Sequence, residues 1–168
     1  MTIINPETVK AIYANISNLE RCCDLINKLS DEDLSEEGFT LAMLIAGTNE
    51  LNLIKYANDV LKLNFSKPDK YGYTSLHLTA KFNQLLALKY ICENTNIDIE
   101  LKTNAGYTPL ICAASYGTLE IIKYLALEQN ANMHVKSYSG KGLDYYSKNN
   151  PSKKVRNYIT RSLEYSHV

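Results

Sequence analysis

A repeat of 34 residues is the feature of this sequence that most constrains its fold. The string GYTSLHLTA at residues 72–80 returns as GYTPLICAA at residues 106–114. A unit of this size cannot bury its own apolar face, but a stack of such units can, so the repeat predicts a stacked array. Identical residues recur at the same interval in six sets: Gly38, Gly72 and Gly106; Thr40, Thr74 and Thr108; Ala46, Ala80 and Ala114; Leu51, Leu85 and Leu119; Lys55, Lys89 and Lys123; and Tyr56, Tyr90 and Tyr124.

Each unit predicts a turn followed by two helices. The first glycine permits the positive φ of a tight turn, and the threonine two residues later is a candidate N-cap. Pro109 suits the first position of a helix, where no backbone N–H is needed. Asn49, Asn83 and Gly117 are expected to end the first helix in a left-handed conformation. A second, amphipathic helix follows, as in TLEIIKYLALEQ at 118–129, and an irregular or hairpin segment leads to the next glycine.

These residues resemble the ankyrin repeat, whose pattern centres on T-P-L-H-x-A. The unit at 106–138 is the closest match, while the unit at 72–105 keeps TSLH with Ser75 in place of the proline. The unit at 38–71 is weaker, because Ala42 replaces the leucine. The resemblance implies an all-α solenoid of stacked helix-turn-helix units with hairpin-like return loops.

We therefore expect a single ankyrin-repeat domain over residues 1–168. Leu143 follows Leu110 by 33 residues, one short of the repeat, and Asn15 falls at the turn position of a looser N-terminal unit. Terminal repeats are expected to be atypical because one of their faces meets water. The predicted units are a degenerate N-terminal capping repeat at 1–37, full repeats at 38–71, 72–105 and 106–138, and a C-terminal capping repeat at 139–165.

Composition points to a folded protein without a membrane span. The chain is 45% hydrophobic with a formal net charge of zero, and it has no run of eighteen apolar residues. None of Cys22, Cys23, Cys92 and Cys112 forms a C-x-x-C pair, so we interpret them as small buried hydrophobes rather than as metal ligands or a redox pair. A reducing, cytoplasmic compartment is expected, which would be the host cytosol for a secreted effector.

The two ends of the chain carry opposite charge. Residues 1–37 hold three basic and eight acidic side chains, and residues 136–168 hold seven basic and two acidic ones. Solvated caps and electrostatic steering of a partner are both open interpretations, and we favour solvated caps. The basic residues between 148 and 161 fall on a predicted last helix, but phosphate binding needs more contacts than these. We expect neither a nucleic-acid nor a membrane partner.

No recognised catalytic or metal-binding motif is present. The three histidines are His77, His134 and His167, and no zinc-protease, EF-hand or phosphate-loop pattern occurs. His77 occupies the TSLH position, where the resemblance implies a hydrogen bond between adjacent units. We therefore expect no catalytic residue, no metal, no cofactor and no enzymatic activity. An enzyme with an unrecognised site that uses His77 or a cysteine stays an alternative.

Aromatic residues form the most suggestive functional pattern. Phe39, Tyr73 and Tyr107 share the position after the turn glycine, and Phe82 and Tyr116 share the end of the first helix. The resemblance implies that both positions face the concave groove. Rigid aromatic side chains are enriched at the centres of protein interfaces. Further candidate partner-binding residues fall on the hairpin tips: Lys70, Tyr71, Asn104 and Tyr138.

Two interpretations of these aromatics remain open, namely partner binding and packing between neighbouring hairpins. Tyr56, Tyr90 and Tyr124, on the second helix, favour a structural stacking role. The leading hypothesis is a non-enzymatic protein–protein interaction module, monomeric by itself, that binds through its groove and hairpin tips. The alternative is a dedicated inhibitor or immunity protein, or a host-directed microbial effector, that masks or targets one enzyme.

Overall fold

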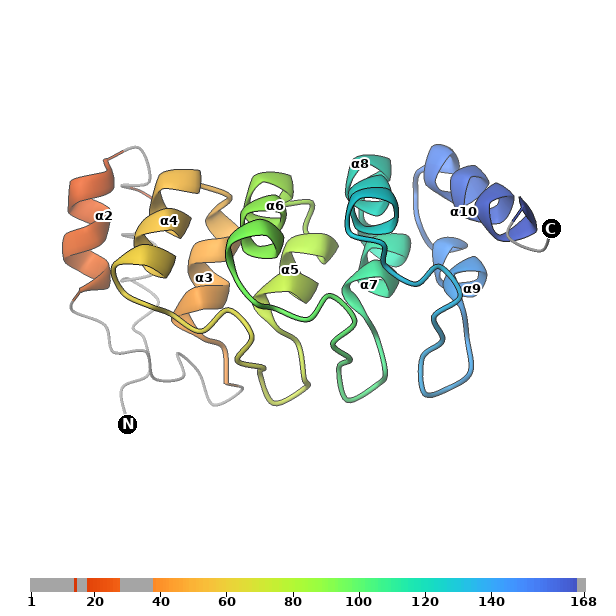
Figure 1. Cartoon of the computed structure of the whole chain (residues 1–168), viewed down its shortest axis with the longest axis horizontal. Coiled ribbons are helices and arrows are strands. Elements are labelled where there is room, and N and C mark those ends of the chain that lie inside the picture. Colours follow the sequence, from red (N-terminus) through yellow and green to blue (C-terminus); the bar gives the residue numbers. More distant parts are fainter. Residues whose placement is uncertain (1–13, 15–17, 28–37, 166–168) are drawn as a thin grey trace.

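The chain forms an elongated stack of helix pairs, with its loops projecting to one side (Figure 1). The computed structural model describes residue 14 and residues 18–27 and 38–165. Every regular element within these ranges is helical, which confirms the predicted all-α solenoid. The first helices are α3 (Leu41–Thr48), α5 (Ser75–Lys81), α7 (Pro109–Tyr116) and α9 (Leu143–Ser147). The second helices are α4 (Leu51–Asp59), α6 (Leu85–Asn94), α8 (Leu119–Lys123) and α10 (Lys153–Tyr165). Helix α8 continues as the π-helical turn η1 (Tyr124–Glu128), and α2 (Leu19–Ile26) precedes all of these helices.

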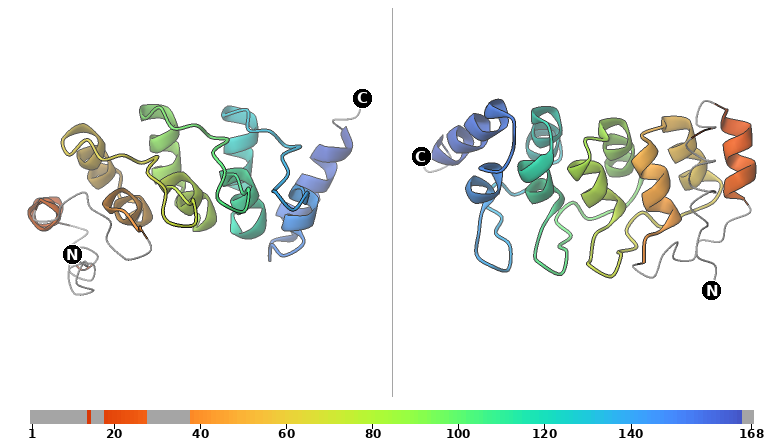
Figure 2. Two further views of the ribbon diagram at one scale, coloured as in Figure 1. Left: turned by 90° about the horizontal axis from the view of Figure 1, so that it is seen from below. Right: turned by 180° about the vertical axis from the view of Figure 1, so that it is seen from behind.

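The helices pack in two rows, and successive units lie side by side along the long axis in all three views (Figures 1 and 2). In the first row α5 packs between α3 and α7, and α7 packs against α9. In the second row α4 packs between α2 and α6. Helix α10 closes the C-terminal end by packing on α7, α8 and α9.

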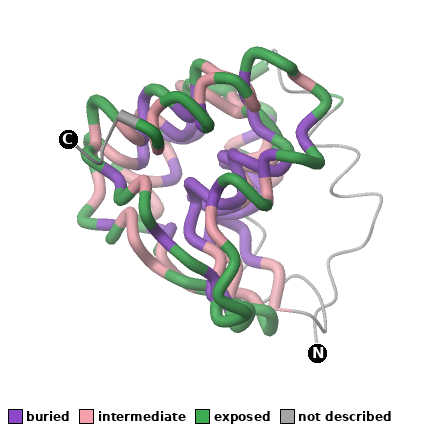
Figure 3. The backbone as a smooth tube through the Cα atoms, turned by 90° about the vertical axis from the view of Figure 1, so that its right-hand side faces the viewer, coloured by how far each residue is buried: buried purple, intermediate pink, exposed green. Residues whose placement is uncertain are grey.

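The core lies between the two rows, and the loop turns are exposed (Figure 3). Residues 41–46 of α3 and 109–115 of α7 are all buried. Small side chains such as Ala80 and Ala114 are fully buried and allow neighbouring helices to approach closely. The apolar strings of the sequence therefore form the centre of the stack.

The predicted turns and caps are present. The glycines that begin the units have φ values from +76° to +84°. Thr40 caps α3, because the Met43 N–H donates to its hydroxyl oxygen at 3.2 Å. Thr108 caps α7 in the same way through the Ile111 N–H at 3.4 Å, and Pro109 occupies the first helical turn.

One predicted left-handed residue is wrong. Asn49 and Asn83 have the expected positive φ, +58° and +63°. Gly117 is extended instead, with φ −79° and ψ 172°. A Cβ at this position would lie 2.7 Å from the Ala113 carbonyl oxygen and 3.0 Å from that of Ala80. Glycine is needed here because backbone atoms of α7 itself, and next those of α5, lie too close for a side chain, not because the turn is left-handed.

His77 joins two units, as the resemblance implied. The Thr74 N–H donates to its Nδ1 at 3.2 Å, so the ring hydrogen belongs on Nε2. Nε2 lies 3.0 Å from the Leu101 carbonyl oxygen and 2.9 Å from that of Tyr107, and it donates to them. Burial lowers the pKa of the His77 imidazole below its ordinary value.

The tyrosines of the second helices also join units, which confirms their structural role. Each hydroxyl donates to a residue about 30 positions earlier in the chain, in the preceding unit. The acceptors are Asn27 Oδ1 for Tyr56 at 3.0 Å, Asp59 Oδ1 for Tyr90 at 3.3 Å and Glu93 Oε1 for Tyr124 at 3.0 Å.

Backbone hydrogen bonds connect successive return loops. The Asn104 N–H donates to the Tyr71 carbonyl oxygen at 2.9 Å, and the Tyr138 N–H donates to that of Ala105 at 3.2 Å. An isolated antiparallel bridge between Lys136 and Gly142 gives the last loop its hairpin form. The loops thus form a continuous layer beside the first helices.

Some sequence predictions concern residues outside the described ranges. Asn15 and His167 are among them, and the residue limits of the capping and full repeats stay predictions. Within the described ranges none of the four cysteines forms a disulfide, and no helix has the length and apolar character to cross a membrane.

Replacing Ser75 with alanine is expected to stabilise the protein by about 1 kcal/mol. The Ser75 hydroxyl is the one buried side-chain polar atom of the described residues without a hydrogen-bond partner. Removing it ends an uncompensated desolvation cost. The matched control is Ser115→Ala, because the Ser115 hydroxyl donates to the Ile111 carbonyl oxygen at 3.2 Å. Urea unfolding measures both variants, and a Ser75→Ala protein less stable than the parent would contradict this account.

Candidate binding site

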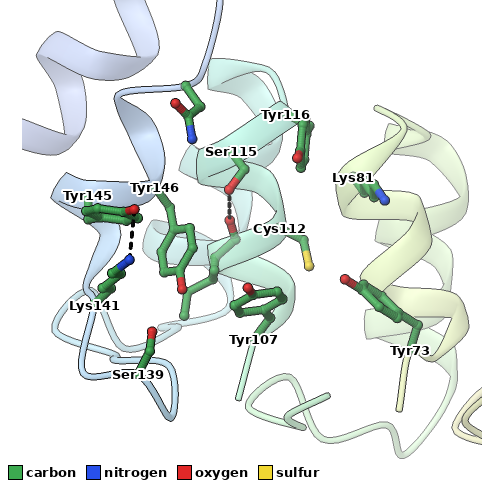
Figure 4. A pocket seen from close by; sticks show the side chains of 12 residues that line it. Tyr73, Lys81, Tyr107, Cys112, Ser115, Tyr116, Ser139, Lys141, Tyr145 and Tyr146 are labelled. Carbon is green, nitrogen blue, oxygen red and sulfur yellow. Dashed lines mark hydrogen bonds between the residues drawn. The ribbon is translucent and has the colours of Figure 1, made fainter. Parts of the chain in front are cut away.

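A pocket of about 340 Å³ opens between the first helices and the return loops in the C-terminal half of the stack (Figure 4). Helices α5, α7 and α9 and the loop before α9 contribute its walls. We call it the tyrosine pocket. Its lining residues are Tyr73, Lys81, Tyr107, Ile111, Cys112, Ser115, Tyr116, Ser139, Lys141, Tyr145, Tyr146 and Asn149.

The repeat itself places the tyrosines together. Tyr73 and Tyr107 each precede a first helix at the same repeat position, so stacking the units sets them along one wall. Tyr107 meets Tyr146 edge-to-face with ring centroids 5.3 Å apart. Tyr146 contacts Tyr145 in the same way, also at 5.3 Å. These edge-to-face pairs restrict the rings, which leaves a rigid aromatic surface.

Lys81 lies among three aromatic rings. Its Nζ is 5.6 Å from the ring centroid of Tyr73, 5.4 Å from that of Phe82 and 5.5 Å from that of Tyr116. All three distances fall within the range of cation–π attraction. The end of α5 therefore holds a half-buried cation in a defined position.

Lys141 provides a second cation at the opposite wall. Its Nζ donates to the Tyr145 hydroxyl at 2.8 Å and lies 4.0 Å from the centroid of that ring. The hydrogen bond to Tyr145 raises the pKa of the Lys141 ammonium, so the side chain stays charged at neutral pH.

The Tyr73 and Tyr107 hydroxyls of the pocket are protonated at neutral pH, because the pKa of each is raised. Burial raises the pKa of the Tyr73 phenol to about 12. The pKa of Tyr107 is raised first by its hydrogen bond with Tyr146. Tyr146 donates to Ser137 Oγ at 2.9 Å, and Ser137 Oγ lies 2.9 Å from Ser139 Oγ. The pocket thus offers hydroxyl hydrogen bonds next to two ammonium groups.

The structure brings together only part of the predicted binding set. Tyr73, Tyr107 and Tyr116 line the tyrosine pocket, and Phe82 contacts Lys81 at its rim. Phe82 and Tyr116 are both 59% exposed, which is high for such large apolar groups. Phe39, by contrast, is half-buried against the core at the other end of the stack.

The four hairpin-tip residues lie outside the pocket and make contacts between loops or with each other. Asn104 Nδ2 donates to the Lys70 carbonyl oxygen at 2.9 Å, and Lys70 Nζ lies 5.0 Å from the Tyr71 ring centroid. Tyr138 is 70% exposed and lies under Lys102 Nζ at 5.6 Å. The packing interpretation therefore applies to Asn104, while Tyr71 and Tyr138 keep exposed surface for a partner.

Sequence reasoning missed the two lysines and two of the tyrosines. Lys81 shares a repeat position with Ser115, and a polar position that recurs beside Phe82 and Tyr116 was an available signal. Tyr145 and Tyr146 gave no such signal, because the last unit is one residue shorter and falls out of register there.

The tyrosine pocket is lined by groups that suit non-covalent binding. Burial raises the pKa of the Cys112 thiol to about 12, so no thiolate nucleophile forms near neutral pH. Both ring nitrogens of His77 are engaged by the backbone. No group of three or more His, Cys, Asp or Glu side chains within the described ranges is placed to hold a metal ion. Aromatic walls, two cations and hydroxyl groups are suited to recognition of a ligand.

Comparison with known proteins identifies the repeat. A family model described as ankyrin repeats (3 copies) matches residues 61–137. This range covers α5 to η1 and therefore the pocket residues that lie on or just before α5 and α7. The comparison with curated proteins gave no match.

Proposed function

The chain belongs to the ankyrin-repeat family, whose repeats generally act as protein–protein interaction modules, and from this premise we propose that it binds a partner protein through its concave groove. The tyrosine pocket is the centre of the proposed interface. The exposed hairpin tips with Tyr71 and Tyr138 form its edge.

The observation that carries this proposal is the pairing of exposed aromatics with a rigid tyrosine wall. Exposed large apolar side chains are common singly, but grouped ones mark interaction sites. Phe82 and Tyr116 come from adjacent units and meet around the same ammonium group of Lys81. Such an arrangement supplies a large contact area at low entropic cost, as interface hot spots do.

Affinity capture with the Phe82→Ala/Tyr116→Ala variant tests the proposal. Both side chains are exposed, so their truncation leaves the core intact. A hot-spot pair is worth about 2 kcal/mol or more, so we expect the partner's affinity to fall by about 30-fold or more. The matched control is Val60→Ala/Leu127→Ala, which removes two exposed apolar groups, 61% and 64% exposed, from second-row positions.

Partners would be identified by mass spectrometry after capture from the native cell, and affinities measured with the purified proteins. Equal loss in the groove and control variants, or no loss in either, would contradict a groove interface. The inhibitor and effector hypotheses require the same groove, and they predict one further experimental result. The captured partner would be a single enzyme that regains activity when this protein is removed.

A further inference from the structure

The tyrosine pocket has an unbalanced charge. Its twelve lining residues include two lysines and five tyrosines but no aspartate or glutamate. No ion pair joins Lys81 or Lys141 to a carboxylate within the described ranges. The only strong partners of these ammonium groups are aromatic rings and one phenol. Such partners stabilise a cation but do not neutralise it.

The aromatic cage also fixes where this charge lies. Lys81 Nζ is within 5.6 Å of three ring centroids. Its positive charge acts to lower the pKa of the Cys112 thiol, which lines the pocket. A lysine that moves freely in water loses side-chain entropy when it binds a ligand. Lys81 is already held between Tyr73 and Tyr116, so less entropy remains to be lost.

The acidic group beside Tyr73 is engaged elsewhere. Asp69 Oδ1 accepts hydrogen bonds from the Tyr71 N–H at 2.9 Å and the Tyr73 N–H at 2.8 Å. These bonds hold the carboxylate in the turn that precedes α5. The Tyr73 hydroxyl makes no hydrogen bond to a described residue, and it points across the pocket in Figure 4. It is therefore a second donor, next to Lys81, that is available to a ligand.

We propose that the tyrosine pocket binds an aspartate or glutamate side chain of an acidic peptide segment in the protein partner, with Lys81 as the main anion contact. Lys141 and the Tyr73 hydroxyl would give the additional hydrogen bonds. This proposal deepens the function proposed above and rests on it.

The surroundings of the pocket favour a peptide over a free anion. A volume of about 340 Å³ is at the small end of ligand pockets, which measure roughly 300–1,000 Å³, and suits side chains rather than a folded domain. Exposed Phe82 and Tyr116 continue the surface beyond the cations. They would pack against apolar residues flanking the acidic one. The expected ligand is thus an acidic residue within a short apolar sequence.

Selection from a random-peptide display library, with the full chain as bait, tests this proposal. We expect the selected peptides to share an aspartate or glutamate next to apolar residues. A fluorescein-labelled copy of the best peptide is then titrated by fluorescence polarisation. Lys81→Met should weaken its binding by about tenfold or more, and exchanging the peptide's carboxylate for its amide should do the same.

Lys89→Met is the matched control, because Lys89 is also half-buried over an aromatic ring, with its Nζ 4.9 Å from the Tyr124 centroid, but lies outside the pocket. It should leave binding unchanged. Lys81→Glu should restore binding to a peptide whose acidic residue is replaced by lysine.

The following results would overturn the acidic-peptide proposal: no peptide selected above background, no enrichment of acidic residues, or equal losses in Lys81→Met and Lys89→Met. The proposed groove interface is judged separately, by the capture of the partner with the Phe82→Ala/Tyr116→Ala variant. A partner that depends on Phe82 and Tyr116 but not on Lys81 would sustain the groove and refute the acidic ligand.

Discussion

Gly106→Ala is expected to lower the free energy of unfolding by about 3 kcal/mol or more. Two costs combine at this position. The backbone has φ +79°, a conformation that costs an L-residue roughly 1–2 kcal/mol. In addition, a Cβ would lie 2.8 Å from Tyr138 Cγ and would collide with the Tyr138 backbone nitrogen. That nitrogen donates to the Ala105 carbonyl oxygen, so the collision separates two return loops.

Gly140→Ala is the matched control because it isolates the first cost. Gly140 has nearly the same φ, +76°, but nothing lies within 4 Å of its added Cβ. Its substitution should therefore cost only about 1–2 kcal/mol, the backbone term. Urea unfolding of the two variants measures the difference, which is the cost of forcing the loops apart.

Equal destabilisation by the two substitutions would contradict this account. It would mean that the return loops move apart without penalty and that the φ of the turn is the only constraint. A larger loss at Gly106 would instead show that the loops contribute to the coupling between units, on which the shape of the groove depends.

The repeat was sufficient to predict the stack of helix pairs, the turn glycines and the threonine N-caps. Each of these features depends on residues that are close in sequence. Gly117 shows where such reasoning fails. A glycine after a helix is commonly a left-handed cap, and nothing nearby in the sequence distinguishes that role from a close approach of backbones. A Cβ at Gly117 would lie 2.7 Å from the Ala113 carbonyl oxygen of its own unit and 3.0 Å from the Ala80 carbonyl oxygen of the preceding unit. Only the packed stack reveals that constraint.

Only part of the candidate site could be predicted from the sequence. Repeat positions identified Tyr73, Tyr107 and Tyr116 because register alone aligns them. Lys81 matters for a different reason, since rings from two units surround its ammonium group. Tyr145 and Tyr146 reach the pocket from the irregular last unit. Pockets between units combine residues from different repeat positions, and comparing equivalent positions does not find such combinations.

Position 77 shows how one unit can depend on a polar side chain that its neighbour lacks. The next unit has Ile111 at the equivalent position, and Ile111 is 1% exposed. His77 is equally buried but supplies hydrogen bonds to three backbone groups, Thr74 N–H and the carbonyls of Leu101 and Tyr107. Because Tyr107 lines the tyrosine pocket, His77 also positions one of its walls.

His77→Ile is accordingly expected to lower the free energy of unfolding by about 3 kcal/mol or more, although isoleucine suits the equivalent site. The substitution leaves one buried and two part-buried backbone groups without their partner, and a buried group left unsatisfied costs about 1–3 kcal/mol. His77→Gln should cost less, because its amide can still donate and accept. Urea unfolding measures both, and a His77→Ile protein as stable as the parent would show that these hydrogen bonds contribute nothing.

The pH dependence of stability provides the second test of His77. Its pKa in the folded protein lies below the ordinary value of 6.5, because burial disfavours the charged ring. The unfolded chain therefore binds a proton that the folded chain excludes, and the free energy of unfolding falls as the pH drops through 6.5 towards the folded pKa. Glutamine does not titrate, so the stability gap between the parent and His77→Gln should narrow from about pH 7.5 to about pH 5. The difference in stability between the parent and His77→Gln could instead stay constant over this range. His77 would then be protonated in the folded protein, and the account of an uncharged ring that joins the two units by hydrogen bonds would be wrong.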